Sequence, residues 1–214
     1  MSDKPLISAS GLSVGFKVGS GIFRKSLLKA VDNVTLDIER GSFFGLVGES
    51  GSGKTTLGRA FLKAVPITSG TARYTDDEVD LDIGTLTGPA LKDYRKRAQL
   101  IFQDPYAALS PRMTVRDIIA EPLEVMGLTK SREETDARVR EIAAKCRLNL
   151  EHLRRFPHAF SGGQRQRISI ARALVSRPQF IVADESVAAL DVSIQADVLN
   201  LLKEIQREMG LTFL

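Results

Sequence analysis

The chain has 214 residues, 43% of them hydrophobic, which is enough to bury a sizeable core in one domain that carries an inserted subdomain. Thirty basic residues against 26 acidic ones leave a formal net charge of only +4, and because the charges are mixed along the chain, a nucleic-acid-binding surface is not indicated. With one cysteine, Cys146, and no apolar stretch near the roughly 18 residues of a spanning helix, we expect a cytosolic chain without a disulfide that reaches a membrane only through a partner.

The N-terminal segment is typical of a small antiparallel sheet. Between Leu6 and Ile38, runs such as residues 12–16 and 34–38 alternate apolar and polar side chains, and turns rich in glycine separate them. Alternation of this kind is the pattern of strands with one buried face. We therefore expect an antiparallel β subdomain over about residues 1–40.

Residues 48–55 contain a glycine-rich phosphate loop with the sequence GESGSGKT. It matches G-x-x-x-x-G-K-[ST], in which glycines let backbone N–H groups surround the phosphates, the lysine reaches the terminal phosphates and the hydroxyl meets Mg²⁺. The apolar run 43–47 before it predicts a buried strand, and residues 55–65 after it predict a helix that Pro66 ends. The N-terminus of that helix then lies under the phosphates.

A helical insertion is expected after a second core strand at residues 99–102. Between about residues 104 and 160, the patterns that begin at Thr114 and Ser131 are typical of capping boxes and predict helix starts. We assign about residues 104–167 to a helical subdomain.

The remaining sequence returns to the core. A helix over 164–176, a buried strand over 180–183 and a helix over about 193–209 are expected in that order. We assign about residues 41–103 and 168–214 to the nucleotide-binding core.

Two further motifs follow the phosphate loop: residues 161–164 read SGGQ, and the strand 180–183 leads into Asp184 and Glu185. The longer stretches around the motifs are LVGESGSGKTT at 46–56, IFQDP at 101–105 and FSGGQRQRI at 160–168. They resemble the ATP-binding subunits of ABC transporters, most closely the branch that imports dipeptides, oligopeptides and nickel. The resemblance covers almost the whole chain and implies an α/β fold, a P-loop NTPase (RecA-like) core with an N-terminal antiparallel β subdomain and an inserted α-helical subdomain.

The resemblance implies a site for ATP and Mg²⁺. Lys54 would hold the β and γ phosphates, Thr55 would ligate Mg²⁺, and Asp184 would reach the same ion through its water shell. Glu185 matches the general base that polarises the attacking water, and Gln103 matches a residue that contacts Mg²⁺ or water and senses the γ-phosphate. A salt-bridged surface glutamate and an ordinary turn glutamine are the alternatives for these two positions. The implied catalytic residues are Glu185, Lys54 and Gln103, and the implied metal ligands are Thr55, Gln103 and Asp184.

The resemblance also implies that ATP lies between two chains. The two glycines of residues 161–164 let the N-terminus of a helix face an anion, although a merely capped helix start is the alternative. In the family this motif binds the γ-phosphate held by the opposite subunit.

Phe16 lies where the family places an aromatic ring that stacks on adenine. The alternatives are that Phe16 is an ordinary core phenylalanine, or that Phe23 stacks on adenine instead. The implied nucleotide-binding residues are Phe16, Gly48, Glu49, Ser50, Gly51, Ser52, Gly53, Lys54, Thr55, Thr56, Ser161, Gly162, Gly163, Gln164 and Asp191.

The chain departs from the family pattern in two places. Ala188 replaces a serine that helps to couple the two sites, while Asp191 is retained. The family's switch histidine comes a few residues beyond the strand that starts at Leu211, whereas this sequence ends at Leu214, so we expect a domain that is cut short. Neither His152 nor His158 can replace it by position, and we expect both to be surface or packing residues.

The functional prediction is a peripheral subunit on the cytoplasmic face of the membrane that binds and hydrolyses ATP to drive import of peptides or a related small solute. Its implied partners are membrane-spanning permease subunits, a second ATP-binding subunit in a homodimer or heterodimer, and a solute-binding protein. A soluble ABC-type ATPase that is not coupled to transport is the first alternative. A nucleotide-binding module without turnover is the second.

Overall fold

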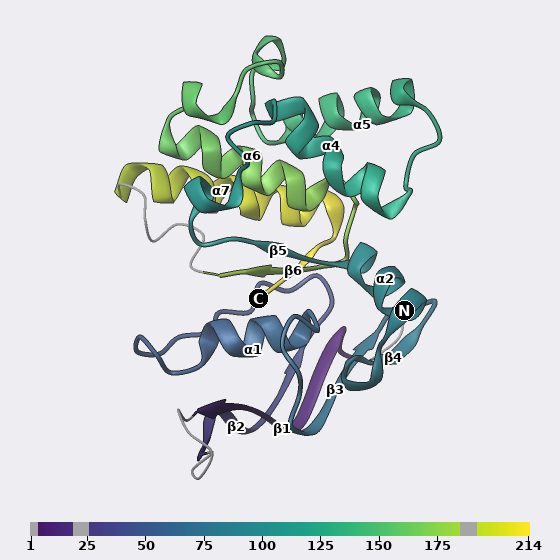
Figure 1. Ribbon diagram of the computed structural model, residues 1–214, viewed down its shortest axis with the longest axis vertical. Helices are drawn as coiled ribbons and strands as arrows, with labels where there is room; N and C mark the ends of the chain where they lie inside the picture. The colour runs from purple at the N-terminus through teal and green to yellow at the C-terminus, as the bar shows by residue number, and fades with distance from the viewer. Residues whose placement is uncertain (1–3, 19–25, 185–191) are drawn as a thin grey trace. The chain divides into compact units, whose positions relative to one another are not determined.

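The computed structural model describes residues 4–18, 26–184 and 192–214 (Figure 1). The chain divides into two compact units, one of residues 1–95 with 212–214 and the other of residues 96–211. The predicted phosphate loop belongs to the first unit, and the predicted helical insertion belongs to the second.

The first unit contains a four-stranded antiparallel sheet with the strand order β2-β1-β3-β4. Its strands are β1 (Ile7–Val18), β2 (Ser26–Ile38), β3 (Ser69–Thr75) and β4 (Asp80–Asp82). Ile7 of β1 pairs with Ile38 on one side and with Tyr74 on the other, which confirms the predicted antiparallel sheet. Strands β3 and β4 were not predicted, because only Ala72 and Tyr74 are buried in β3 and their alternation is too short to recognise.

Helix α1 (Lys54–Phe61), the turn η1 (Ile83–Thr85) and α2 (Gly88–Arg97) follow in the chain. The ring of Tyr94 on α2 meets Tyr74 edge to face at 5.4 Å, and its hydroxyl donates to the carbonyl of Phe61. Burial raises the pKa of Tyr94 well above its ordinary value, so the phenol stays neutral. Helix α1 ends before the predicted position at residue 65, because Lys63 takes a left-handed backbone conformation with φ of 52°.

The apolar run before the phosphate loop is paired only at its start. Phe43 forms a parallel bridge with Phe213 of β7 (Thr212–Phe213), their ring centroids lie 4.9 Å apart, and the N–H of Phe44 donates to the carbonyl of Phe213 over 2.8 Å. The rest of the run forms no strand, and Val47 is 95% exposed. The prediction of a buried strand over residues 43–47 is therefore wrong, because the run forms only the isolated bridge at Phe43, which is itself 44% exposed.

The second unit contains two parallel strands that bear out the prediction from the apolar runs. Strand β5 (Ala98–Ile101) pairs with β6 (Phe180–Ala183), from Ala98 opposite Phe180 to Ile101 opposite Ala183. The helices of this unit are α3 (Pro105–Ala108), α4 (Val115–Met126), α5 (Arg132–Lys145), η2 (Leu150–His152), η3 (Pro157–Ala159), α6 (Gly162–Leu174) and α7 (Val192–Met209). Figure 1 shows α4 to α7 on one side of these strands, and α6 contacts both β5 and α4.

Local capping sets the helix boundaries in the second unit. The hydroxyl of Thr114 accepts a hydrogen bond from the N–H of Asp117, and the hydroxyl of Ser131 accepts one from the N–H of Glu134, each over 3.2 Å. These bonds satisfy donors that have no acceptor inside the helix. Both predicted helix starts are confirmed.

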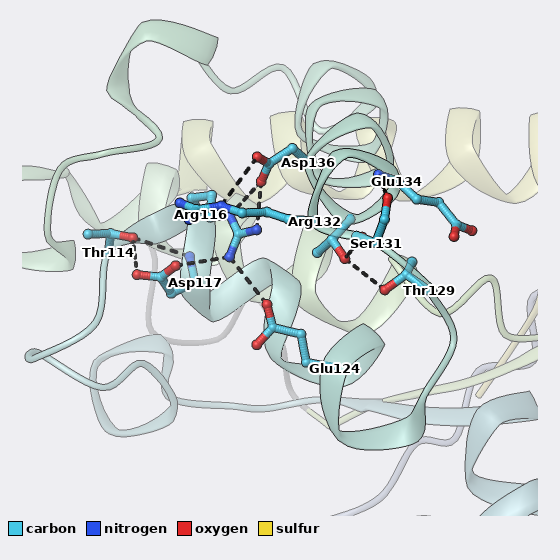
Figure 2. A network of polar contacts seen from close by, with 10 residues as sticks. Thr114, Arg116, Asp117, Glu124, Thr129, Ser131, Arg132, Glu134 and Asp136 are labelled. Atoms are coloured by element: carbon cyan, nitrogen blue, oxygen red, sulfur yellow. Dashed lines mark hydrogen bonds and ion pairs between the residues drawn. The ribbon is translucent and has the colours of Figure 1, made fainter.

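Arg116 joins α4 to α5 through a network of ion pairs (Figure 2). Its Nε donates to Oδ1 of Asp136 over 2.7 Å, and its Nη1 lies 3.2 Å from Oδ1 of Asp117 and 3.3 Å from Oε1 of Glu124. The hydroxyl of Thr114 donates to Asp117 over 2.6 Å. The pKa of Asp117 lies below its ordinary value, chiefly because of the hydrogen bond from Thr114. Burial, the next-largest influence, opposes this shift, and the hydrogen bond and charge of Arg116 add to it.

Asp117→Asn is expected to lower the urea midpoint of unfolding at neutral pH but to have little effect in acid. A carboxylate whose pKa is lowered by folding stabilises the fold above its unfolded pKa, and that stabilisation is lost as the pH falls through the lowered folded pKa. Urea unfolding of both proteins from pH 7 down through the ordinary value of 3.8 checks this. Asp77→Asn, which alters a mostly exposed pair with Arg40 in the first unit, serves as the matched control. A difference that does not change with pH would contradict the prediction.

Candidate functional site

The phosphate loop curls tightly into the first turn of α1. Gly51 and Gly53 have positive φ angles of 81° and 93°, and the N–H of Ser52 donates to the carbonyl of Glu49 over 3.2 Å. Gly53 caps α1, and a Cβ on it would lie 2.2 Å from the carbonyl oxygen of Ala30 on β2. The loop therefore lies against the sheet so closely that only glycine fits at position 53.

Lys54 closes the loop with its side chain. Its Nζ donates to the carbonyl of Gly48 over 2.7 Å and to that of Glu49 over 2.8 Å. Within this fully described segment no side chain caps α1, and no acidic residue lies in its first turn. The positive end of the helix and the ammonium group therefore act together, which favours an anion at this loop.

The other predicted residues of the loop lie in the same place, since residues 48–56 are contiguous. The hydroxyl-bearing residues Thr55 and Thr56 stand in the first turn of α1 and are half-buried, whereas Glu49 and Ser50 are exposed. A hydroxyl at the first turn of this helix is the type of donor that the phosphate-loop pattern assigns to Mg²⁺.

The predicted adenine-stacking residue, Phe16, lies on β1. Its side chain is 38% exposed, and it pairs with Leu28 of β2, which is 59% exposed. An exposed aromatic face fits a stacking role better than a core role. Phe23, the alternative, lies outside the described residues.

Gln103 and Asp184 follow the two parallel strands of the second unit. Gln103 comes two residues after Ile101 ends β5, and Asp184 comes directly after β6. The N–H of Asp184 donates to the carbonyl of Ile101 over 3.2 Å, which extends the ladder by one step. Because carboxyl ends of parallel strands meet at one edge of a sheet, both residues leave the sheet at the same edge.

The SGGQ motif forms the N-terminus of α6 and is held by a reciprocal capping box. The hydroxyl of Ser161 accepts from the N–H of Gln164 over 3.3 Å, and the N–H of Ser161 donates to Oε1 of Gln164 over 3.0 Å. The helix thus begins two residues earlier than predicted, at Gly162. The two glycines occupy its first turn, where N–H groups have no acceptor inside the helix.

Two predicted site residues, Glu185 and Asp191, lie outside the described residues. Ala188, which departs from the family's sequence pattern, lies outside them too. Their assigned roles stay predictions.

The cysteine and the histidines pack as expected. Cys146 is buried, and burial raises the pKa of its thiol to about 12, so the thiolate is not formed near neutral pH. The ring of His152 meets Phe160 edge to face at 6.2 Å, and the ring of His158 stacks on Phe156 at 5.8 Å.

One contact near the motifs was missed by the sequence analysis. The guanidinium of Arg165 lies 4.2 Å from the ring centroid of Tyr106, and its Nε donates to the carbonyl of Pro157 over 2.9 Å. Tyr106 is 62% exposed and follows Asp104 and Pro105 directly. An aromatic residue at an exposed turn was the available signal. The cation–π contact ties α3 to the first turns of α6.

Comparison with known proteins decides the family. The sequence model of the ABC transporter family matches residues 31–188, most of the chain. The chain belongs to the ABC transporter family. Among the described residues, no helix is long and apolar enough to cross a membrane.

Curated members of the ABC transporter family match almost the full chain. Over 99% of this chain, it is 51% identical to the oligopeptide transport ATP-binding protein OppF of Streptococcus mutans. It is also 51% identical, over 99% of this chain, to the dipeptide transport ATP-binding protein DppF of Lactococcus lactis. It spans only 66% of the length of each of these relatives.

Solved structures of the family show the same fold. A dimeric ATP-binding cassette in a post-hydrolysis state, bound to ADP and Pi, superposes with a TM-score of 0.82 at 30% identity, covering 97% of this chain and 85% of the other. The predicted fold class, a P-loop NTPase core with an antiparallel β subdomain and a helical subdomain, is confirmed.

Proposed function

We propose that this chain is part of an ATP-binding and ATP-hydrolysing subunit that drives import of peptides or a related small solute. The observation that carries the proposal is the loop 48–55, in which Lys54 and the uncapped end of α1 present positive charge to one place. The oligopeptide and dipeptide transport proteins that it resembles support the substrate class.

The chain's own residues fit Mg²⁺ carried on a nucleotide. Thr55 offers a hydroxyl and Asp184 a carboxylate, and both kinds of oxygen suit this hard cation. Within the described ranges, no three His, Cys, Asp or Glu side chains gather to form a cage for a metal. Mg²⁺ usually keeps water and phosphate ligands and takes few from the protein. When bound, the ion would neutralise phosphate charge, and Gln103 is the third proposed ligand.

Hydrolysis requires charge neutralisation and an oriented water more than covalent chemistry. In this proposal Lys54 holds the β and γ phosphates, Glu185 accepts the proton of the attacking water, and Gln103 senses the γ-phosphate. Phe16 stacks on adenine. These roles rest on the match of each residue to the family's motifs.

A second ATP-binding subunit completes each site in this proposal. The N-terminus of α6, with residues 161–164, and Asp191 would face ATP held by the loop of the partner chain. The dimeric state of the similar solved cassette supports this arrangement. Permease subunits and a solute-binding protein complete the proposed transporter, with this subunit peripheral on the cytoplasmic face of the membrane.

ATP-dependent dimerisation and turnover of the full-length protein test the proposal. The wild type is expected to hydrolyse ATP only with Mg²⁺, and Glu185→Gln is expected to lose turnover by at least about 100-fold while it accumulates an ATP-bound dimer, because binding persists when the general base is gone. Light scattering and a phosphate-release assay measure both. Cells that carry Glu185→Gln should fail to take up labelled di- and tripeptides.

Three outcomes would count against the proposal. Hydrolysis that is unchanged in Glu185→Gln would remove the assigned base. Normal peptide uptake with an inactive ATPase would favour the soluble ATPase alternative. An absence of both ATP binding and turnover in the wild type would leave no ATPase at all.

A further inference from the structure

Gly163, in the first turn of α6, is buried against α7. A Cβ built on Gly163 would lie 2.7 Å from Cγ2 of Ile194. Carbon atoms in contact are normally separated by about 3.5–4.0 Å, so a methyl group has no room there. The backbone at Gly163 is ordinary helix rather than left-handed, and alanine forms helix better than glycine does. The contact with Ile194, and not the backbone, is what requires glycine.

Ile194 cannot easily turn away from Gly163. It lies in the first turn of α7, where a β-branched side chain has one strongly preferred χ1 rotamer, so its Cγ2 has little freedom. One turn later the fully buried Val198 fixes the same face of α7. A side chain at position 163 would therefore push the start of α7 away from α6.

The two residues of this contact stand next to the predicted machinery in sequence. Gly163 belongs to the SGGQ motif, whose capping box holds the N-terminus of α6. Ile194 follows Asp191 by three residues, on the helix that the chain enters after Glu185. The contact therefore fixes the start of α7 relative to the SGGQ motif.

We propose that Gly163 is a positioning residue that seats the start of α7 against α6 and so holds the SGGQ motif at the N-terminus of α6 in place. The role is additional to any contact of Gly163 with phosphate. Its consequence for hydrolysis rests on the proposed function, whereas the packing contact does not.

A double-mutant cycle in the full-length protein tests the inference. Gly163→Ala is expected to lower the ATPase kcat about tenfold or more. Gly163→Ala with Ile194→Ala, which removes Cγ2, is expected to recover most of the rate. Gly163→Ala with Ile194→Val is the matched control, because valine keeps that methyl group, and it is expected to recover none.

The outcomes separate this inference from the proposed function. If Ile194→Ala and Ile194→Val restore Gly163→Ala equally, or neither restores it, Gly163 acts through phosphate alone and the inference is overturned. If the wild type has no ATPase activity, the proposed function fails, and the same cycle read by thermal unfolding still decides the contact. Rescue of the melting temperature by alanine but not by valine supports the contact, and its absence overturns it.

Discussion

Lys54→Ala is expected to weaken ATP binding at least about 100-fold, because it removes the one ammonium group that the loop presents to the phosphates and each charge-assisted hydrogen bond contributes about 1.5–3 kcal/mol. The structure adds a second reason. Nζ of Lys54 donates to the carbonyls of Gly48 and Glu49 and so holds the loop in its curled form. Calorimetric titration of the full-length protein with ATP and Mg²⁺ measures the loss.

Lys92→Ala is the matched control for Lys54→Ala. It removes the same charge from an exposed position on α2 and puts alanine where a helix accepts it well, so we expect wild-type ATP affinity. The far-ultraviolet circular dichroism of both variants should match the wild type. Equal weakening in the two variants would show that general charge, and not the position of Lys54, governs binding.

Features that depend on a few neighbouring residues were predictable from the sequence. The hydroxyls of Thr114 and Ser131 each cap a donor three residues ahead, so the side-chain pattern alone locates both helix starts. The strand 180–183 was found because its buried side chains form one unbroken apolar run. The phosphate loop was found for the same reason: its glycines and Lys54 act within one turn of chain.

Features that depend on distant partners were not predictable. Residues 43–47 form an apolar run that predicts a buried strand, yet its pairing is decided by Phe213, far along the chain, which bridges only Phe43. The motifs show that glycine is expected at positions 53 and 163. They do not show that the carbonyl oxygen of Ala30 and Cγ2 of Ile194 are the atoms that exclude a side chain there. Such contacts arise only when the fold brings separate segments together.

Gly53→Ala is expected to lower the free energy of unfolding by about 3 kcal/mol or more and to abolish ATP binding. Two costs add at this position. The φ of 93° is a conformation that side-chain-bearing residues rarely adopt, and the new Cβ would lie 2.2 Å from the carbonyl oxygen of Ala30, a backbone atom that cannot move without disturbing β2. Relief of the clash must shift the start of α1, so the N–H groups that face the phosphates move with it.

Gly51→Ala separates these two costs within the same loop. Gly51 has a φ of 81°, but a Cβ there would meet no atom within 4 Å, so only backbone strain of about 1–2 kcal/mol is expected. Urea unfolding measures the stability that each variant loses, and the loss for Gly53→Ala should exceed the loss for Gly51→Ala. If the two variants lose equal stability, the close approach to Ala30 does not constrain the loop, and glycine at position 53 serves its backbone angle alone.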